Sequence, residues 1–226
     1  MHQDTPLHLD ILPEAQRRLW GELRDLPSDF VLYGGTAIAL QLGHRESIDF
    51  DFFSNRPLDG TQLDLSLPFL GGATITQREP NTLSCTVIRG GQIKLSFFGV
   101  PNLPRLAAPI VSQDNGLQIA ALLDLAGTKA SVIQMRAEAK DYIDIDALLS
   151  DGRIDLPTAL ASAKLIYGAQ FNPQITLKAL SYFDDGGLAD LPDDVKLRLV
   201  RAVKAVDLDH LPSLAEPIFS PARRKE

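Results

Sequence analysis

The sequence predicts an α+β protein in which a β-sheet is followed by a helical part. Polar and apolar residues alternate in several short runs between residues 48 and 99, which is typical of strands that bury one face. Prolines then punctuate residues 101–109, after which the composition shifts to helix formers. We therefore predict a sheet domain over residues 1–113 and a helical domain over residues 114–226.

The composition is that of a globular protein with a substantial core. Of the 226 residues, 45% are hydrophobic, which is enough for one large domain or two small ones. The sequence has no apolar run of about 18 residues, and Met1–Asp10 lacks the basic segment and apolar block of a signal peptide. We therefore expect a soluble, cytoplasmic protein without a membrane partner.

The cysteine, the histidines and the net charge exclude some kinds of metal site and nucleic-acid surface. A single cysteine, Cys85, rules out an internal disulfide and a thiolate zinc site, and four scattered histidines lack the spacing of zinc ligands. The formal net charge of −7 argues against a broad nucleic-acid surface, although a local basic groove stays open. Any metal is therefore expected to be a hard ion.

The chain begins with a predicted helix. Residues 13–26 place leucines along one stripe and arginines largely off it, which predicts an amphipathic helix packed on the sheet. Arg17 and Arg18 lie on its polar side. A solvated helix face explains them more simply than contact with RNA, so we assign them no function.

A strand, a glycine turn and a second helix follow. Residues 30–33 form an apolar run that ends at Gly34 and Gly35, which predicts a short buried strand. Thr36 is of a type that caps helices, and Gly43 suits the left-handed residue after a helix. We therefore predict a helix capped by Thr36 and ended by Gly43.

The next strand separates an apolar face from an acidic face. Side chains on a strand point alternately to opposite faces, so Ile48, Phe50 and Phe52 share the face expected in the core. Asp49 and Asp51 share the other face, with Cα atoms roughly 7 Å apart. Their oxygens can therefore meet on one cation, and Mg²⁺ is commonly held by one or two carboxylates plus substrate phosphates.

The helix after the glycine turn adds a place for phosphate. Its first N–H groups have no partner within the helix and lie at the positive end of its dipole, so Gly35-Thr36 can hold an anion. Taken singly, a Gly-Gly pair is usually a turn and an Asp-x-Asp pair is usually surface. Their order and spacing together favour a nucleotide site.

This stretch resembles a known family. Its pattern is Gly34-Gly35-Thr36, a short helix, then His44-Arg45-x-Ser47-x-Asp49-x-Asp51-Phe52-Phe53. The pattern is similar to the nucleotidyltransferase AbiEii/AbiGii toxin family, a branch of the polymerase-β-like nucleotidyltransferase superfamily. The resemblance implies a nucleotidyltransferase-like mixed β-sheet flanked by helices, a helical C-terminal domain, and a site for an NTP with Mg²⁺ (or Mn²⁺).

The resemblance also assigns residues and partners. Asp49 and Asp51 are the expected metal ligands. The expected nucleotide-binding residues are Gly34, Gly35, Thr36, Arg45, Ser47 and Lys129. Some relatives act on the 3′ end of tRNA, so the implied partners are an NTP, an RNA acceptor such as tRNA, and a cognate antitoxin.

The strands that follow carry a departure from the family pattern. Three alternating runs between residues 73 and 99, the last two joined by Gly90-Gly91, predict an antiparallel extension of the sheet. The superfamily normally takes a third carboxylate from such a strand. The aligned residue here is Ser96, which is a weak Mg²⁺ ligand. Lys94, on the same face, is either a phosphate contact or an ordinary exposed lysine.

Residues 117–149 predict two helices with a break near residues 136–139. Lys129 is the only cation in the first helix, and a buried lysine costs desolvation unless its ammonium reaches water or an anion. Relatives carry a lysine here, then an arginine and a basic-Asp-x-x-Asp element. This chain matches them with Lys129, Arg136, Lys140, Asp141 and Asp144. The resemblance implies that Lys129 neutralises the triphosphate while Asp141 holds Lys129 or a substrate group; for Lys140 and Asp144 we expect helix charges and local pairing.

Two functions are compatible with these residues. The first is a nucleotidyltransferase of toxin–antitoxin type, which transfers a nucleoside monophosphate from Mg²⁺-NTP to an acceptor hydroxyl, for instance on RNA. Its catalytic residues are Asp49, Asp51, Lys129 and Asp141. The alternative keeps the fold as a catalytically impaired nucleotide-binding or protein-interaction module, because Ser96 stands at the third acidic position.

Overall fold

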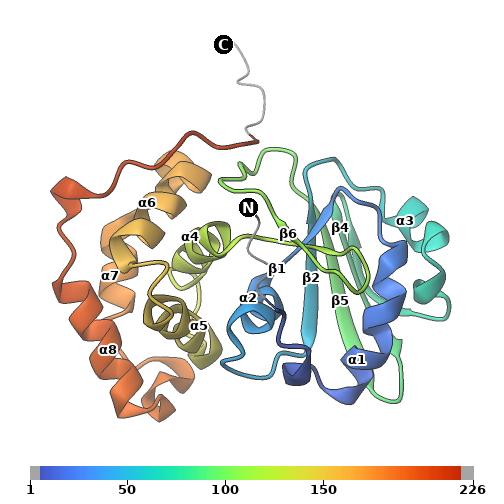
Figure 1. Ribbon diagram of the computed structural model, residues 1–226, viewed down its shortest axis with the longest axis horizontal. Coiled ribbons are helices and arrows are strands. Elements are labelled where there is room, and N and C mark those ends of the chain that lie inside the picture. The colour runs from blue at the N-terminus through green and yellow to red at the C-terminus, as the bar shows by residue number, and fades with distance from the viewer. Residues whose placement is uncertain (1–5, 220–226) are drawn as a thin grey trace. The chain divides into compact units, whose positions relative to one another are not determined.

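The computed structural model describes residues 6–219 and divides into two compact units (Figure 1). The sheet unit contains the chain up to Leu103 together with Pro109–Ala120, and the helical unit contains Pro104–Ala108 and the chain from Ala121 onward. Residues 1–5, half of the N-terminal segment that lacks signal-peptide features, lie outside the described residues. The domain boundary after residue 113 stays a prediction.

The sheet unit is built on one mixed β-sheet. Its strands are β1 (Phe30–Tyr33), β2 (Asp49–Ser54), β3 (Thr74–Glu79), β4 (Thr82–Ile88), β5 (Gln92–Gly99), β6 (Ile110–Val111) and β7 (Gln118–Ile119). They lie in the order β3-β4-β5-β2-β1-β7-β6. The β2–β5 and β1–β7 pairs are parallel and the other pairs are antiparallel. This architecture confirms the predicted α+β class and mixed sheet; the predicted antiparallel extension, β3-β4-β5, joins β2 through a parallel pair.

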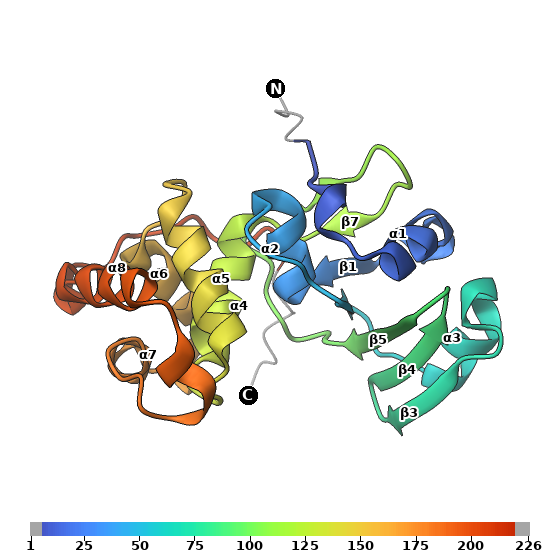
Figure 2. The same ribbon diagram turned by 90° about the horizontal axis from the view of Figure 1, so that it is seen from below.

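Three helices accompany the sheet. They are α1 (Glu14–Trp20), α2 (Gly34–Leu42) and α3 (Gly60–Ser66). Figures 1 and 2 show α1 and α3 on one side of the sheet and α2 on the other. The Trp20 ring of α1 lies 6.5 Å from the ring of Phe50, so α1 covers the strand face that carries the apolar side chains.

Two predicted details of the sheet unit are wrong. Ile48 is 59% exposed and precedes β2, so it does not join Phe50 and Phe52 in the core. Residues 118–119 form β7, which pairs with β1, and the helix predicted from residue 117 begins only at Leu122. Short apolar runs do not distinguish a buried strand from a helix by their period, which explains the second error.

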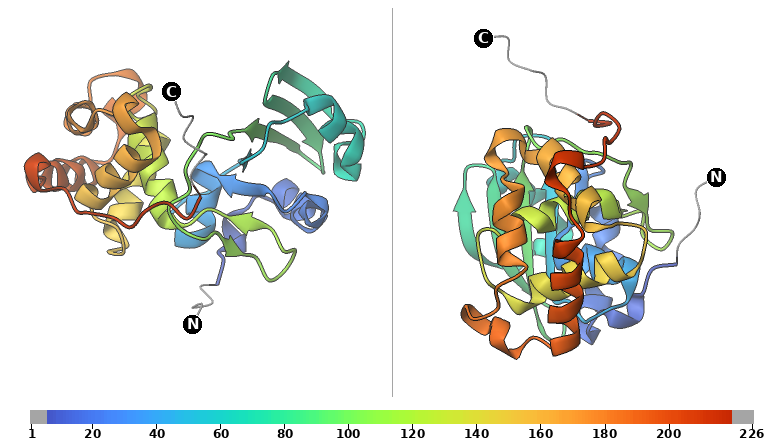
Figure 3. Two further views of the ribbon diagram at one scale, coloured as in Figure 1. Left: turned by 90° about the horizontal axis from the view of Figure 1, so that it is seen from above. Right: turned by 90° about the vertical axis from the view of Figure 1, so that its left-hand side faces the viewer.

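The helical unit packs its helices around a separate core. Its helices are α4 (Leu122–Val132), α5 (Ala139–Ser150), α6 (Leu156–Tyr167), α7 (Pro173–Ala179) and α8 (Asp193–Lys204) (Figure 3). The predicted break between the first two helices is confirmed at residues 133–138. Gly127 lets α4 approach α6 closely, because an added Cβ would lie 2.9 Å from the backbone nitrogen of Ala163. Within residues 6–219, no helix is both long and apolar enough to cross a membrane.

Candidate active site

The acidic pair lies on one face of β2. Phe50 and Phe52 are fully buried on the opposite face, while Asp49 and Asp51 are only partly buried. The strand therefore presents two carboxylates side by side, as its alternation predicts. Among the described residues, none donates a hydrogen bond to the Asp49 carboxylate, which leaves its oxygens for a cation.

Gly34 brings the start of α2 against this pair. Its φ of +74° is a conformation that favours glycine, and a Cβ added there would lie 2.7 Å from Oδ2 of Asp51. Both the backbone conformation and the lack of space therefore require glycine. The close approach places the first turn of a helix next to a carboxylate of the acidic pair.

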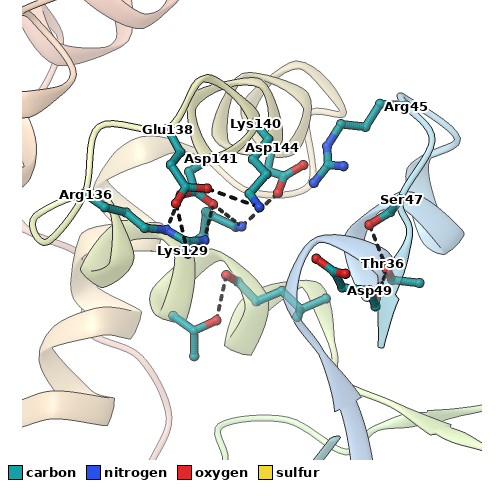
Figure 4. A network of polar contacts seen from close by, with 12 residues as sticks. Thr36, Arg45, Ser47, Asp49, Lys129, Arg136, Glu138, Lys140, Asp141 and Asp144 are labelled. Atoms are coloured by element: carbon teal, nitrogen blue, oxygen red, sulfur yellow. Dashed lines mark hydrogen bonds and ion pairs between the residues drawn. The ribbon is translucent and has the colours of Figure 1, made fainter. Parts of the chain in front are cut away.

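Thr36 does not have the capping role predicted for it. The helix begins earlier, at Gly34, and no side chain caps its first turn. The Thr36 hydroxyl instead donates to the carbonyl oxygen of Asp49, and it is hydrogen bonded to the hydroxyl of Ser47 at 2.7 Å (Figure 4). Thr36 therefore ties α2 to the backbone that enters β2. The predicted C-cap is confirmed, since Gly43 is left-handed with φ of +64°.

Arg45 and Ser47 lie in the loop between α2 and β2. Ser47 is buried, and its hydroxyl contacts Thr36 as described above. Arg45 donates from Nη1 to the carbonyl oxygen of Glu46 at 2.8 Å. Both residues thus belong to the segment that positions Asp49, while their predicted contact with nucleotide stays a prediction.

The residue beside Asp51 on the neighbouring strand is a serine. In the parallel β2–β5 pair, Asp51 is opposite Ser96 and Asp49 is opposite Lys94. Ser96 is buried, and its hydroxyl lies 3.5 Å from that of Ser84 on β4. In the part of the chain that the structure describes, no group of three His, Cys, Asp or Glu residues is arranged to hold a metal.

The acidic pair fits a single hard divalent ion. Two partly exposed carboxylates on one face supply the oxygen ligands that Mg²⁺ prefers, and Mg²⁺ usually completes its shell with water and substrate phosphates. A second ion would need further carboxylates, and β5 offers Ser96 in that place. Asp49 and Asp51 are therefore sufficient ligands for one ion, but among the described residues the site lacks the carboxylates that a second ion would need.

In the helical unit, Lys129 contacts two buried carboxylates. Its Nζ lies 2.8 Å from Asp141 Oδ1 and 2.8 Å from Asp144 Oδ2, and both aspartates are fully buried (Figure 4). The lysine side chain is itself only 7% exposed. Of the two possibilities for a buried lysine, contact with water or with an anion, Lys129 has the second, because two carboxylates hold its ammonium inside the unit.

Arg136 completes the charge arrangement around Asp141. Its Nε donates to Asp141 Oδ2 at 2.7 Å and its Nη2 donates to Oδ1 at 3.2 Å. Burial works against ionisation of Asp141, but the hydrogen bonds from Arg136 and the charge of Lys129 outweigh it and hold the pKa of Asp141 below its usual value. Asp141 is therefore an anion at neutral pH, in contact with two cations.

Asp144 is a partner that the sequence interpretation missed. We expected Asp144 to be a helix charge with local pairing, but it contacts Lys129 from the preceding helix. A signal was present, because residues three apart on a helix lie on the same side, so Asp144 shares the side of Asp141. Lys140 does pair locally, with Glu138 at 3.1 Å.

Comparison with known proteins assigns the family. Residues 18–216 match the family described as "Nucleotidyl transferase AbiEii toxin, Type IV TA system". The chain belongs to this AbiEii family. The resemblance inferred from the glycine turn and the acidic pair is thereby confirmed, and this description implies a nucleotide substrate and an antitoxin partner.

Other relatives agree with the AbiEii assignment. An uncharacterised protein of Aquifex aeolicus (strain VF5) is 33% identical over 160 residues, which cover 70% of this chain and 75% of the relative. The nucleotidyltransferase toxin MenT4 from Mycobacterium tuberculosis H37Rv is similar in structure, with a TM-score of 0.58 and 17% identity over 86% of this chain and 83% of the toxin. A putative nucleotidyltransferase from H. pylori has a TM-score of 0.51 and 17% identity over 84% and 90%. The solved structures support the fold.

Proposed function

We propose that this AbiEii protein transfers a nucleoside monophosphate from an NTP, bound with Mg²⁺ or Mn²⁺, to a hydroxyl group of an RNA such as tRNA. The observation that carries the proposal is that Asp49 and Asp51 lie on the same face of β2 and that the start of α2 lies against Asp51. A carboxylate pair next to an uncapped helix N-terminus suits a cation and a phosphate together. The cytoplasm, where NTPs and tRNA occur together, is the proposed location.

The residues of the sheet unit have positioning roles in this proposal. Asp49 and Asp51 hold the divalent ion, which when bound neutralises charge on the phosphate oxygens. Thr36 fixes the backbone of Asp49 through its hydroxyl. Gly34 lets the first N–H groups of α2 come near the phosphate, and Arg45 and Ser47 lie in the segment that leads to the acidic pair. Transfer of this kind depends mainly on positioning and charge neutralisation.

Lys129 and Asp141 keep their predicted catalytic roles as part of the proposal. A lysine ammonium has three N–H donors, and contacts with Asp141 and Asp144 account for two of them. The third is sufficient for one phosphate oxygen. Asp141, which Arg136 holds, and Asp144 would then keep the lysine in place, so that the ammonium acts as a fixed point charge.

Labelled NTPs test the proposed transfer directly. Full-length protein is incubated with each α-labelled NTP, Mg²⁺ or Mn²⁺ and total RNA, and the label in RNA is measured. The wild type is expected to label one RNA class, and Asp49→Ala and Asp51→Ala are expected to reduce labelling by at least a hundredfold. Asp25→Ala, at an exposed position of the same unit, serves as the matched control. Equal labelling by the wild type and both site variants would refute the proposal.

A second candidate function follows from Ser96. Because Ser96 lies opposite Asp51 and no third acid accompanies the pair in the described residues, the protein would bind nucleotide without efficient transfer. It would then act as a nucleotide-binding or protein-interaction module, with the antitoxin as one expected partner. Calorimetry with Mg²⁺ and NTP separates the two functions: binding without RNA labelling favours the module, and labelling favours the enzyme.

A further inference from the structure

Aromatic rings continue the acidic face of the sheet. Tyr33 on β1, Phe53 on β2 and Phe98 on β5 lie in a row across three neighbouring strands. The Tyr33 and Phe53 rings are stacked, with centroids 4.7 Å apart and an interplanar angle of 16°. Phe53 and Phe98 meet edge to face at 5.3 Å and 75°. We name these three residues the aromatic row.

The aromatic row differs in burial from the rings on the other face. Phe50, Phe52 and Phe97 point to the covered face and have no exposed surface. Phe53 and Phe98 are only partly buried, although both sit in the same strands. One side of an open sheet normally carries polar residues where it meets solvent. Phe53 and Phe98 therefore keep some exposed surface on the side of the sheet that carries the acidic pair.

The strand register places the aromatic row beside the acidic pair. Tyr33 is the β1 partner of Asp51, and Phe53 follows Asp51 by two residues on the same face, roughly 7 Å along the strand. Phe98 stands in the same relation to Ser96 on β5. A ligand bound through phosphate at the acidic pair would thus have flat apolar surface one residue pair away.

Phe98 has fewer aromatic contacts than Phe53. Among the described residues, its one aromatic contact is edge to face with Phe53, so at least one face of the Phe98 ring has no other ring on it. Phe53 is already stacked on Tyr33, which fixes its orientation. The row is therefore two stacked rings and a third, partly exposed ring whose one aromatic contact among the described residues is edge to face.

We propose that the aromatic row, with Phe98 foremost, stacks against the nucleobase of a nucleotide whose phosphate is held at Asp49 and Asp51. The proposal rests on the function proposed above. Aromatic side chains stack with any base because every base has a π-face, and this contact contributes roughly 1–3 kcal/mol per base. A protein partner is the weaker explanation, because the apolar rings directly adjoin two carboxylates that such a partner would have to desolvate.

Binding measurements separate the base contact from the phosphate contact. Calorimetry on full-length protein with Mg²⁺ compares inorganic triphosphate with an NTP. The NTP is expected to bind the wild type more tightly than triphosphate does, and Phe98→Ala is expected to lose about tenfold in NTP affinity while its affinity for triphosphate is unchanged. Phe98→Leu keeps an apolar side chain of similar size without the ring and is expected to lose nearly as much.

A fluorescent variant distinguishes a base of the NTP from a base of the RNA, and it keeps an aromatic ring at position 98. Trp20 is the only tryptophan and is buried, so Phe98→Trp adds a reporter in the row. Quenching by an NTP, but not by triphosphate, would assign the donor base. Quenching by a single-stranded RNA oligonucleotide without NTP would assign an acceptor base. Either result supports the proposal.

Two results would count against these ideas in different ways. If triphosphate with Mg²⁺ fails to bind the wild type, the proposed phosphate and metal site fails, and the RNA arm of the fluorescence experiment still tests the aromatic row. If Phe98→Leu and Phe98→Ala bind NTP and RNA as the wild type does, and neither ligand quenches Phe98→Trp, stacking by the aromatic row is overturned.

Discussion

Ser96 on β5 lies directly opposite Asp51 on β2, because the two strands are parallel and pair in register at this point. The next strand continues this line with Ser84, whose hydroxyl is 3.5 Å from that of Ser96. Asp51 is thus followed across the sheet by two buried hydroxyls, those of Ser96 and Ser84. A carboxylate at the position of Ser96 would bind a metal ion more strongly than a hydroxyl does.

The first prediction concerns Ser96→Asp. The new carboxylate would stand beside Asp51, so without metal the two like charges should destabilise the fold and lower Tm by on the order of 5 °C. Mn²⁺ should restore Tm and bind with a higher stoichiometry than in the wild type, measured by thermal unfolding and by paramagnetic resonance of free Mn²⁺. Ser84→Asp places the same buried acid one strand further from Asp51, and an equal gain of Mn²⁺ there would contradict the prediction.

The second prediction concerns Gly34→Ala. Alanine is strained at φ of +74°, and its Cβ would lie 2.7 Å from Asp51 Oδ2, so the carboxylate must move. We expect a loss of about 1–2 kcal/mol in stability and at least a tenfold loss in Mn²⁺ affinity. Gly116→Ala is the matched control, because Gly116 has the same φ with open space around it. It should lose stability alone; a similar loss of Mn²⁺ affinity in both variants would argue against the contact.

The third prediction concerns Thr36→Val, which keeps the shape of the side chain and removes its hydroxyl. The carbonyl of Asp49 and the hydroxyl of Ser47 then lose a partner in a buried setting. We expect about 1–3 kcal/mol lower stability, by urea unfolding, and weaker Mn²⁺ binding. Thr36→Ser retains the hydroxyl and should keep Mn²⁺ affinity, whereas weakened binding in Thr36→Ser as well would exclude the hydrogen bond as the cause.

The sequence was sufficient to predict most of the sheet and the acidic pair, because both depend on local periodicity. Alternation along β2 places Asp49 and Asp51 on one face in any fold that buries Phe50 and Phe52. The family pattern then placed Ser96 near Asp51, and the hairpin after β4 made that strand recognisable.

Features that depend on contacts between distant residues were not predictable in this way. The hydroxyl of Thr36 could cap its own helix or reach Asp49, and the sequence does not show which bond forms. The strand β7 has two residues, too few to display a period, and is a strand through its pairing with β1 and β6. Asp144 has its role through Lys129 on another helix.

The fourth prediction concerns Lys129→Met, which replaces the buried ammonium by an apolar group. Asp141 and Asp144 lose the cation that both contact, and breaking a buried ion pair costs about 3–5 kcal/mol. Lys140→Met is the matched control, because Lys140 is half exposed and its pair with Glu138 should contribute less than about 1 kcal/mol. Adding Asp144→Leu to Lys129→Met should recover part of the loss. Equal unfolding free energies for the two lysine variants would show that the buried contacts are not stabilising.

The fifth prediction concerns Asp141→Asn and the fall of the unfolding free energy at low pH. The folded pKa of Asp141 is held below its usual value, because Arg136 and Lys129 outweigh the effect of burial. The carboxylate therefore stabilises the folded state above its unfolded pKa of about 3.9, and this contribution is lost as pH falls toward the folded pKa. In urea unfolding followed by circular dichroism, the wild type should lose stability more steeply below about pH 4 than Asp141→Asn, which starts less stable at pH 7. Asp209→Asn, an exposed substitution of the same kind, should follow the wild type. If the unfolding free energies of the wild type and Asp141→Asn fall equally steeply below about pH 4, protonation of Asp141 is not coupled to folding.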